Sequence, residues 1–223
     1  MRKTIISFMT IALVLIIIGG GTWAYFSDTE TSTGNTFTAG TLNLVPSTSG
    51  TGPVGKYTVT AGGDGINGNV VFIRIAPGDS GSITWTLTND GNLDGTLTIA
   101  SLSTFTENGS NEPESAVVGN NGGGNGDLDD YVGVRLSRGG TYILGDASNY
   151  VPFSGLQAAL NAESQSLTGG STLTYVLEWQ IATDVQAAGA DGKFGTVDDV
   201  QINDNIIQSD TATVDITFTL TQS

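Results

Sequence analysis

Strict alternation of apolar and polar residues is the feature that most restricts what this chain can fold into. Every second residue is apolar in residues 171–181 and again in 212–220, and residues 82–88 repeat the pattern on a shorter scale. Side chains of a β-strand point alternately to opposite faces, so these segments predict strands with one buried face. Trp85 and Trp179 fall in phase with the apolar positions, which predicts that both belong to the core.

Turn signals separate these segments. In Pro77-Gly78-Asp79, proline presets φ and glycine accepts a positive φ, which predicts a tight turn. Asn89-Asp90-Gly91 is a second turn, followed by another alternating segment at 96–100. The sequence therefore predicts that residues 82–88 and 96–100 form a β-hairpin.

The remaining segments also indicate an all-β fold. Residues 156–164, LQAALNAES, form the one plausible helix, short and amphipathic. Further short strands are expected at 36–45, 56–60, 70–75, 131–136 and 141–144, with a turn cluster at 61–68 and surface loops at 46–55 and 104–130. Many short half-buried strands predict an antiparallel two-sheet sandwich, either jelly-roll or immunoglobulin-like, with one short helix and long surface loops.

The N-terminus has the pattern of an export signal. Arg2 and Lys3 precede an uncharged apolar run at 5–18, which is short for a membrane span. Three glycines end the run, and Thr22 and Ala24 place small residues before Tyr25. We expect a signal peptide at 1–24 that is cleaved after Ala24, so that the mature protein is secreted. The alternative is an uncleaved membrane anchor.

Composition excludes several classes of function. The chain carries a net charge of −15, and removing the leader takes away two positive charges and no acid, leaving −17. Such a domain should repel nucleic acid and anionic membranes. The chain has no cysteine and no histidine, so it lacks disulfides, imidazole ligands and an HExxH motif. No pair of acids is singled out by its spacing, and we expect no enzymatic activity.

Five stretches of the chain resemble one family. The segment GGGTWAYFSDTE followed by NTFTAGTLNL resembles the start of the TasA/camelysin family of secreted, fibre-forming surface proteins, which includes archaeal bundling-pilus subunits. The stretches 76–99, 126–136, 167–181 and 203–222 resemble the same family in the same order. The resemblance implies a jelly-roll sandwich and a structural role in an extracellular filament or pilus, in a biofilm matrix or in cell–cell adhesion.

The expected partner is the protein itself. Residues 25–36 are polar after Tyr25 and Phe26, so they add little to their own core. We expect them to pair as a donor strand with an open sheet edge of the next subunit, ahead of a sandwich domain at 37–223. Such a contact does not close, so it yields a filament. The candidate assembly residues are Tyr25, Phe26 and Phe37. The alternative function is a monomeric calcium- or carbohydrate-binding cell-surface module.

One loop is a candidate calcium site. Residues 189–199 contain Asp191, Asp198 and Asp199, with Gly192 and Gly195 to fold backbone carbonyls inward. The stretch resembles the DGxFGTxDD insert of exported proteins that is often read as calcium-binding. A solvated acidic turn is the alternative.

Two further sites follow from short patterns. The acids Asp127, Asp129 and Asp130 flank Leu128, and we expect the leucine to pack while the acids face water. Asn108-Gly109-Ser110 is a sequon, which makes Asn108 a candidate glycosylation site in an exported protein, with chance occurrence as the alternative.

Overall fold

The structure is a computed structural model that describes residues 44–51, 56–62, 65–73, 75–107 and 126–223. All of these residues belong to one compact unit, Gly40–Ser223. The predictions for the leader, for Tyr25, Phe26 and Phe37, and for Asn108 lie outside the described residues. None of the described helices is long and apolar enough to cross a membrane.

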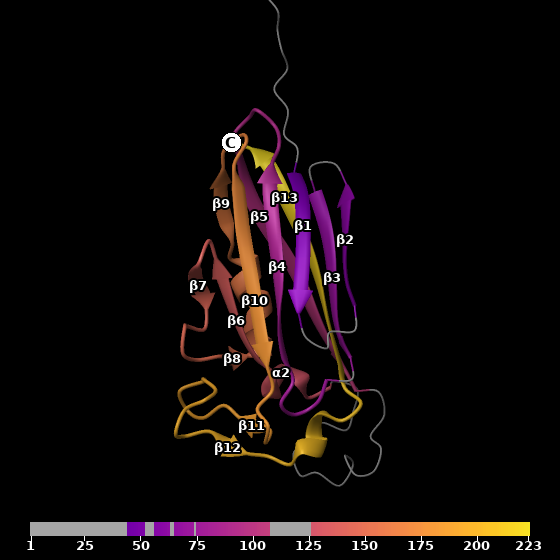
Figure 1. The fold of residues 1–223 in the computed structure, drawn as a ribbon, viewed down its shortest axis with the longest axis vertical. Coiled ribbons are helices and arrows are strands. Elements are labelled where there is room, and N and C mark those ends of the chain that lie inside the picture. The colour runs from indigo at the N-terminus through magenta and orange to yellow at the C-terminus, as the bar shows by residue number, and fades with distance from the viewer. Residues whose placement is uncertain (1–43, 52–55, 63–64, 74, 108–125) are drawn as a thin grey trace, which may run out of the picture. The chain divides into compact units, whose positions relative to one another are not determined.

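Two antiparallel sheets form the fold, which confirms the predicted sandwich (Figure 1). The first sheet has the order β1 (Leu44–Thr51), β4 (Ser80–Asn89), β10 (Thr172–Gln180), β6 (Gly133–Arg138) and β7 (Thr141–Leu144), with β8 (Val151–Pro152) also paired to β6. The second has the order β2 (Lys56–Gly62), β3 (Gly65–Ile73), β13 (Thr211–Gln222), β5 (Gly95–Thr106) and β9 (Ser164–Leu167).

Short elements fill the ends and one side of the sandwich. They are α2 (Leu128–Tyr131), η2 (Phe153–Gly155), α3 (Leu156–Asn161), the pair β11 (Gln186–Ala187) and β12 (Val200–Gln201), and η3 (Asp204–Ile207). Helix α3 confirms the predicted helix, although it ends at Asn161 rather than at residue 164. Leu156 and Leu160 bury its apolar side.

Alternating residues from both sheets build the core. The inward side chains of β4, β10 and β13 are the ones that the alternation predicts: Ile83, Trp85, Leu87, Tyr175, Leu177, Trp179, Ala212, Val214, Ile216, Phe218 and Leu220. The ring of Phe72 meets Trp179 edge-on, with 5.5 Å between centroids, and Trp85 lies 6.2 Å from Phe218. Both tryptophans are therefore core residues, as expected.

The predicted hairpin of 82–88 and 96–100 is wrong. Both segments are strands, but β4 pairs with β1 and β10, whereas β5 pairs with β13 and β9 in the other sheet. The turn at 89–94 therefore crosses from one sheet to the other. Asn89, fully buried, holds this corner: its Nδ2 donates to Leu93 O at 2.8 Å and to Leu167 O at 3.0 Å.

The predicted loop at 46–55 is wrong in its first half, because β1 continues to Thr51. Pro46 does not prevent this, since β1 ends its sheet in the described part of the chain, and proline is tolerated on edge strands. The predicted turn cluster at 61–68 is narrower than expected, with strand on either side of 63–64. The strands predicted at 131–136 and 141–144 correspond to β6 and β7, which pair as a hairpin, and Gly139 and Gly140 supply its two positive φ angles.

Candidate functional site

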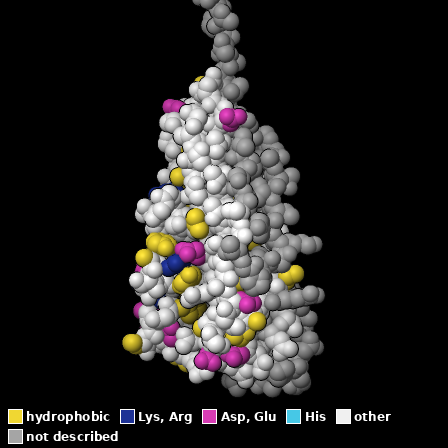
Figure 2. Space-filling model, viewed as in Figure 1, with side chains coloured by type: hydrophobic (Ala, Val, Ile, Leu, Met, Phe, Trp, Pro, Cys, Tyr) yellow, Lys and Arg dark blue, Asp and Glu magenta, His cyan; other side chains and the backbone are white. Residues whose placement is uncertain are grey.

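The acidic loop 189–199 connects β11 and β12 at one end of the sandwich. On the face shown in Figure 2, acidic side chains gather in the lower part, where Figure 1 places β11 and β12. The loop is tied to the sandwich by a backbone bridge between Tyr150 and Phe194, in which Phe194 N donates to Tyr150 O at 2.8 Å. Phe194 is buried, so it anchors the loop like a core residue.

Each predicted ligand of this loop is held by the backbone. Asp199 Oδ2 accepts from Gly195 N at 2.7 Å and from Thr196 N at 3.2 Å. Asp191 Oδ1 accepts from Lys193 N at 2.9 Å, and Asp198 Oδ2 accepts from Asp191 N at 3.3 Å. Gly192 and Gly195 have positive φ angles, as their predicted role requires.

The three carboxylates converge on a single hydroxyl group. Thr196 Oγ1 lies 2.7 Å from an oxygen of Asp198, 3.2 Å from one of Asp199 and 3.4 Å from one of Asp191. A hydroxyl carries one proton, so it donates to only one of three acceptors at a time. The hydrogen bond from Thr196 holds the pKa of Asp198 below its usual value. The structure therefore brings the three predicted ligands together around one point.

The donor types fit calcium, which prefers carboxylate and carbonyl oxygens. The carboxylates nevertheless already accept hydrogen bonds from backbone nitrogens of the loop itself. In the part of the chain that the structure describes, no group of three or more acidic side chains is arranged so that it could hold a metal ion. Binding at this loop would therefore require a shift of side chains.

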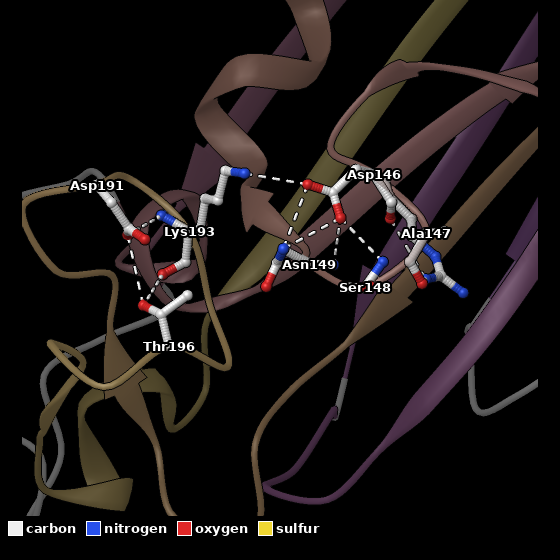
Figure 3. Close-up of polar contacts among 8 residues, drawn as sticks. Asp146, Ala147, Ser148, Asn149, Asp191, Lys193 and Thr196 are labelled. Carbon is white, nitrogen blue, oxygen red and sulfur yellow. Dashed lines mark hydrogen bonds and ion pairs between the residues drawn. The ribbon is translucent and has the colours of Figure 1, made fainter.

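A lysine links the loop to a second turn (Figure 3). Lys193 Nζ lies 3.0 Å from Asp146 Oδ2. Asp146 Oδ1 also accepts from the backbone nitrogens of Ser148 and Asn149, at 2.9 and 2.8 Å. The bond from Ser148 N, followed by Lys193, lowers the pKa of Asp146. Sequence reasoning missed Asp146, although an aspartate that begins Asp-Ala-Ser-Asn is a typical signal of a local side-chain turn.

Arg135 supports that turn through hydrogen bonds. Its guanidinium donates to both oxygens of Glu178, at 2.8 and 2.9 Å, and to Ala147 O at 2.8 Å. The same group lies over the rings of Tyr150 and Tyr142, at 4.6 and 5.3 Å from their centroids. Arginine suits this position because its planar guanidinium can bind a carboxylate with two nitrogens and stack on aromatic rings at the same time. It fixes the turn that carries Asp146.

The second acidic cluster departs from its prediction. Leu128 packs in the core and Asp130 is exposed, as expected, but Asp127 is buried and Asp129 is half-buried. Asp127 N donates to Oδ2 of Asp210, a buried residue that sequence reasoning did not single out. The prediction that all three acids face water is therefore wrong for Asp127. The α2 turn, which begins here, folds it inward.

A small cavity of about 110 Å³ lies beside the acidic loop. Its lining is Tyr131, Gly133, Gln180, Ala182, Gln186, Phe194 and Gly195, which includes no carboxylate and no amine. The space suits a few water molecules rather than a substrate.

Comparison with known proteins gives one match. The family model of camelysin metallo-endopeptidase matches residues 1–51, out of 223. The matched stretch contains the predicted signal peptide, residues 25–36 and β1. No curated protein and no solved structure matches the chain.

Proposed function

We propose that this chain, whose residues 1–51 match the family model of camelysin metallo-endopeptidase, is a secreted structural subunit of an extracellular filament like those of the TasA/camelysin family that it resembles. In this proposal residues 25–36 of one subunit add as a strand to an open sheet edge of the next. Backbone hydrogen bonds supply the strength, and Phe26 fills an apolar pocket. The subunits join head to tail, so the assembly grows without closing.

One observation carries the proposal: the family match includes residues 25–36, the segment for which the sequence predicts the assembly role. The match extends through β1, which ends its sheet in the described part of the chain, as β2 ends the other. The end strands of an open sheet present backbone groups that another strand can pair with. A sandwich built from two open sheets therefore offers a site for strand addition.

The proposal is not an enzymatic one. The matched family bears the name of a metallo-endopeptidase. This chain has no histidine and no cysteine, so only carboxylates and other oxygens remain as metal ligands, and the usual zinc-protease motif is missing. A structural role requires neither.

The test compares the exported protein with a version that lacks residues 25–36. We expect fibres in electron micrographs from the first and a folded, non-assembling subunit from the second, because the alternating strands that build the core lie after the deletion. Phe26→Asp should weaken assembly, since an unpaired buried charge costs several kcal/mol. Phe26→Leu, which stays apolar, is the matched control. Normal fibres from the deleted chain would exclude donor-strand assembly.

A second candidate function is calcium binding at 189–199, and the convergence of three carboxylates on Thr196 Oγ1 favours it. A divalent cation near that point would be surrounded by oxygens of Asp191, Asp198 and Asp199. It would also relieve the repulsion among three negative groups around one proton donor. Calcium would then stabilise the loop and, through Lys193 and Asp146, the neighbouring turn.

Melting curves test this candidate. Calcium at millimolar concentration should raise the melting temperature above that with chelator, because a ligand that binds only the folded state adds RT ln(1 + [L]/Kd). Asp198→Asn with Asp199→Asn should remove the shift. Asp130→Asn with Asp184→Asn takes away the same charge at exposed positions and should leave it. Identical curves in calcium and chelator would exclude a stabilising site.

A further inference from the structure

Strand β5 is paired along its whole length on one side but on only part of the other. Its pairing with β13 extends from Gly95 to Thr106. On the opposite side β9 covers only 95–98. The rest of that side has no strand partner within the described residues, so it is a sheet edge inside the fold. Helix α3 contacts this edge.

Two side-chain amides of α3 occupy the edge. Ser101 N donates to Asn161 Oδ1 at 2.5 Å, and Asn161 Nδ2 donates to Ser101 O at 3.2 Å. One carboxamide thus pairs with both backbone groups of one residue, as a residue of a neighbouring strand does. One turn earlier in the helix, Gln157 Oε1 accepts from Ser103 N at 2.8 Å. The spacing of four residues places both amides on the same side of α3.

The helix itself is fixed to both sheets. Leu156 and Leu160 are fully buried in the core. Just after the helix, both oxygens of Glu163 accept from Arg138 Nη1 at 2.8 Å, and Oε2 also accepts from the Tyr175 hydroxyl at 2.9 Å. Arg138 and Tyr175 belong to the first sheet, whereas Ser101 and Ser103 belong to the second. Helix α3 therefore bridges the sandwich on this side.

We infer that α3 is an edge guard: its two amides take the place of a strand at Ser101–Ser103 and so close β5 to strand addition from a second copy of this chain. An unprotected edge of this length would be a template for pairing with another chain. The guard leaves the edges on the β1 and β2 side for partner strands. The effect of this closure on filament growth rests on the proposed function. The closure of β5 itself does not depend on it.

The geometry specifies what removal of the guard would allow. The backbone groups of Ser101 and Ser103 face α3, so those of Leu102 face β13. In the antiparallel register centred on residue 102, two copies of β5 would set Leu102 opposite Leu102, in a non-hydrogen-bonded pair with about 4.5 Å between Cα atoms. That separation suits a disulfide. The Leu102 side chain is 57% exposed on the outer face, and the chain has no cysteine of its own. A disulfide at Leu102→Cys would therefore report pairing between two copies of β5.

The experiment places Leu102→Cys in the exported protein with and without Gln157→Ala and Asn161→Ala. Alanine favours helix, so the double change removes the amides without weakening α3 by propensity. We expect disulfide-linked dimers after mild oxidation only when the amides are absent. Hydrogen exchange at the Ser101 and Ser103 amides should accelerate in the same variant. Gln201→Ala with Gln208→Ala, two exposed amides elsewhere, is the matched control and should give no disulfide-linked dimers.

Equal dimer yields and equal exchange with and without the two amides would overturn the inference. Circular dichroism verifies folding, and if the double variant unfolds, Asn161→Ala alone is compared with Gln201→Ala in the same two assays. Failure of the proposed filament is a separate outcome. Fibres would then be missing from the unmodified protein, while the comparison of dimer yields at Leu102→Cys would still be readable.

Discussion

Asp210 is the residue whose chemistry is most altered by the fold. It lies just before β13, is 3% exposed, and has one carboxyl oxygen without a hydrogen-bond partner. Burial, together with the nearby acids Glu107, Asp127 and Asp129, raises the pKa of Asp210 to about 7. The neutral acid is therefore favoured in the folded protein below neutral pH.

The pH dependence of stability follows from this shift. The folded state holds the proton of Asp210 more tightly than the unfolded chain does, whose pKa is near 3.8. The stabilisation is complete below pH 3.8 and is lost as the pH rises through about 7, at up to about 1.4 kcal/mol per pH unit. Urea denaturation between about pH 5 and about pH 8 should show this fall, and Asp210→Asn should flatten it.

Few other groups interfere with this measurement. The chain has no histidine, and the acids with lowered pKa, Asp146 and Asp198, finish titrating at lower pH. Burial also raises the pKa of Asp129, in the same acidic cluster, so Asp129 contributes to the same fall. A profile that is already flat in the unmodified protein would show that the fold does not raise the pKa of Asp210.

At the scale of elements, the corner between β4 and β5 decides the topology. Asn89 accepts from Gly91 N at 3.1 Å while its amide nitrogen holds the carbonyls of Leu93 and Leu167. The first bond shapes the turn, and the last one ties the corner to β9 in the second sheet. A single buried side chain thus satisfies backbone groups that a chain crossing between sheets would otherwise leave unpaired.

Asn89→Ala should lower the free energy of unfolding by about 2 kcal/mol, since each lost hydrogen bond contributes about 1 kcal/mol and two carbonyls lose a donor. Asn89→Asp should cost more, because a carboxylate would face those carbonyls. Urea denaturation measures both. Gln201→Ala, on an exposed strand, is the control and should change little. A cost for Asn89→Ala no larger than that of the control would show that water replaces the side chain at the corner.

At the scale of the whole molecule, the acidic groups are kept largely off the sheet faces. The outward positions of β4 and β10 are mostly serine and threonine, and the one acid among them, Glu178, is paired with Arg135. The other acids lie mainly in turns and loops, such as Asp90, 127–130 and 189–199. A chain of net charge −15 thus presents sides of low charge, which suits close approach between copies.

Export should yield a chain that begins at Tyr25, because small residues at Thr22 and Ala24 follow the apolar run at the distance that cleavage requires. The intact mass of the exported protein checks this. A mass equal to residues 25–223 is expected, and any excess that disappears in Asn108→Gln would locate a glycan there. A mass that still includes residues 5–18 would show instead that the protein is anchored.

The amino-acid sequence by itself determined several of the strands, their buried faces and several turns. Alternation at 171–181 and 212–220 named the core residues of β10 and β13 correctly. Gly78 has the positive φ that its turn predicted. These features are local: the direction of a side chain and the allowed φ of a residue depend on nearby backbone alone.

Only the tertiary structure decided which strands become neighbours and which polar groups meet. The segments on either side of Asn89 read as a hairpin, yet they lie in opposite sheets, because alternation specifies a buried face and not a partner. The same holds for Ser101 with Asn161 and for Asp127 with Asp210, which are 60 and 83 residues apart. Such pairs form when the whole core is packed, since only then are buried polar groups forced to find a partner away from water.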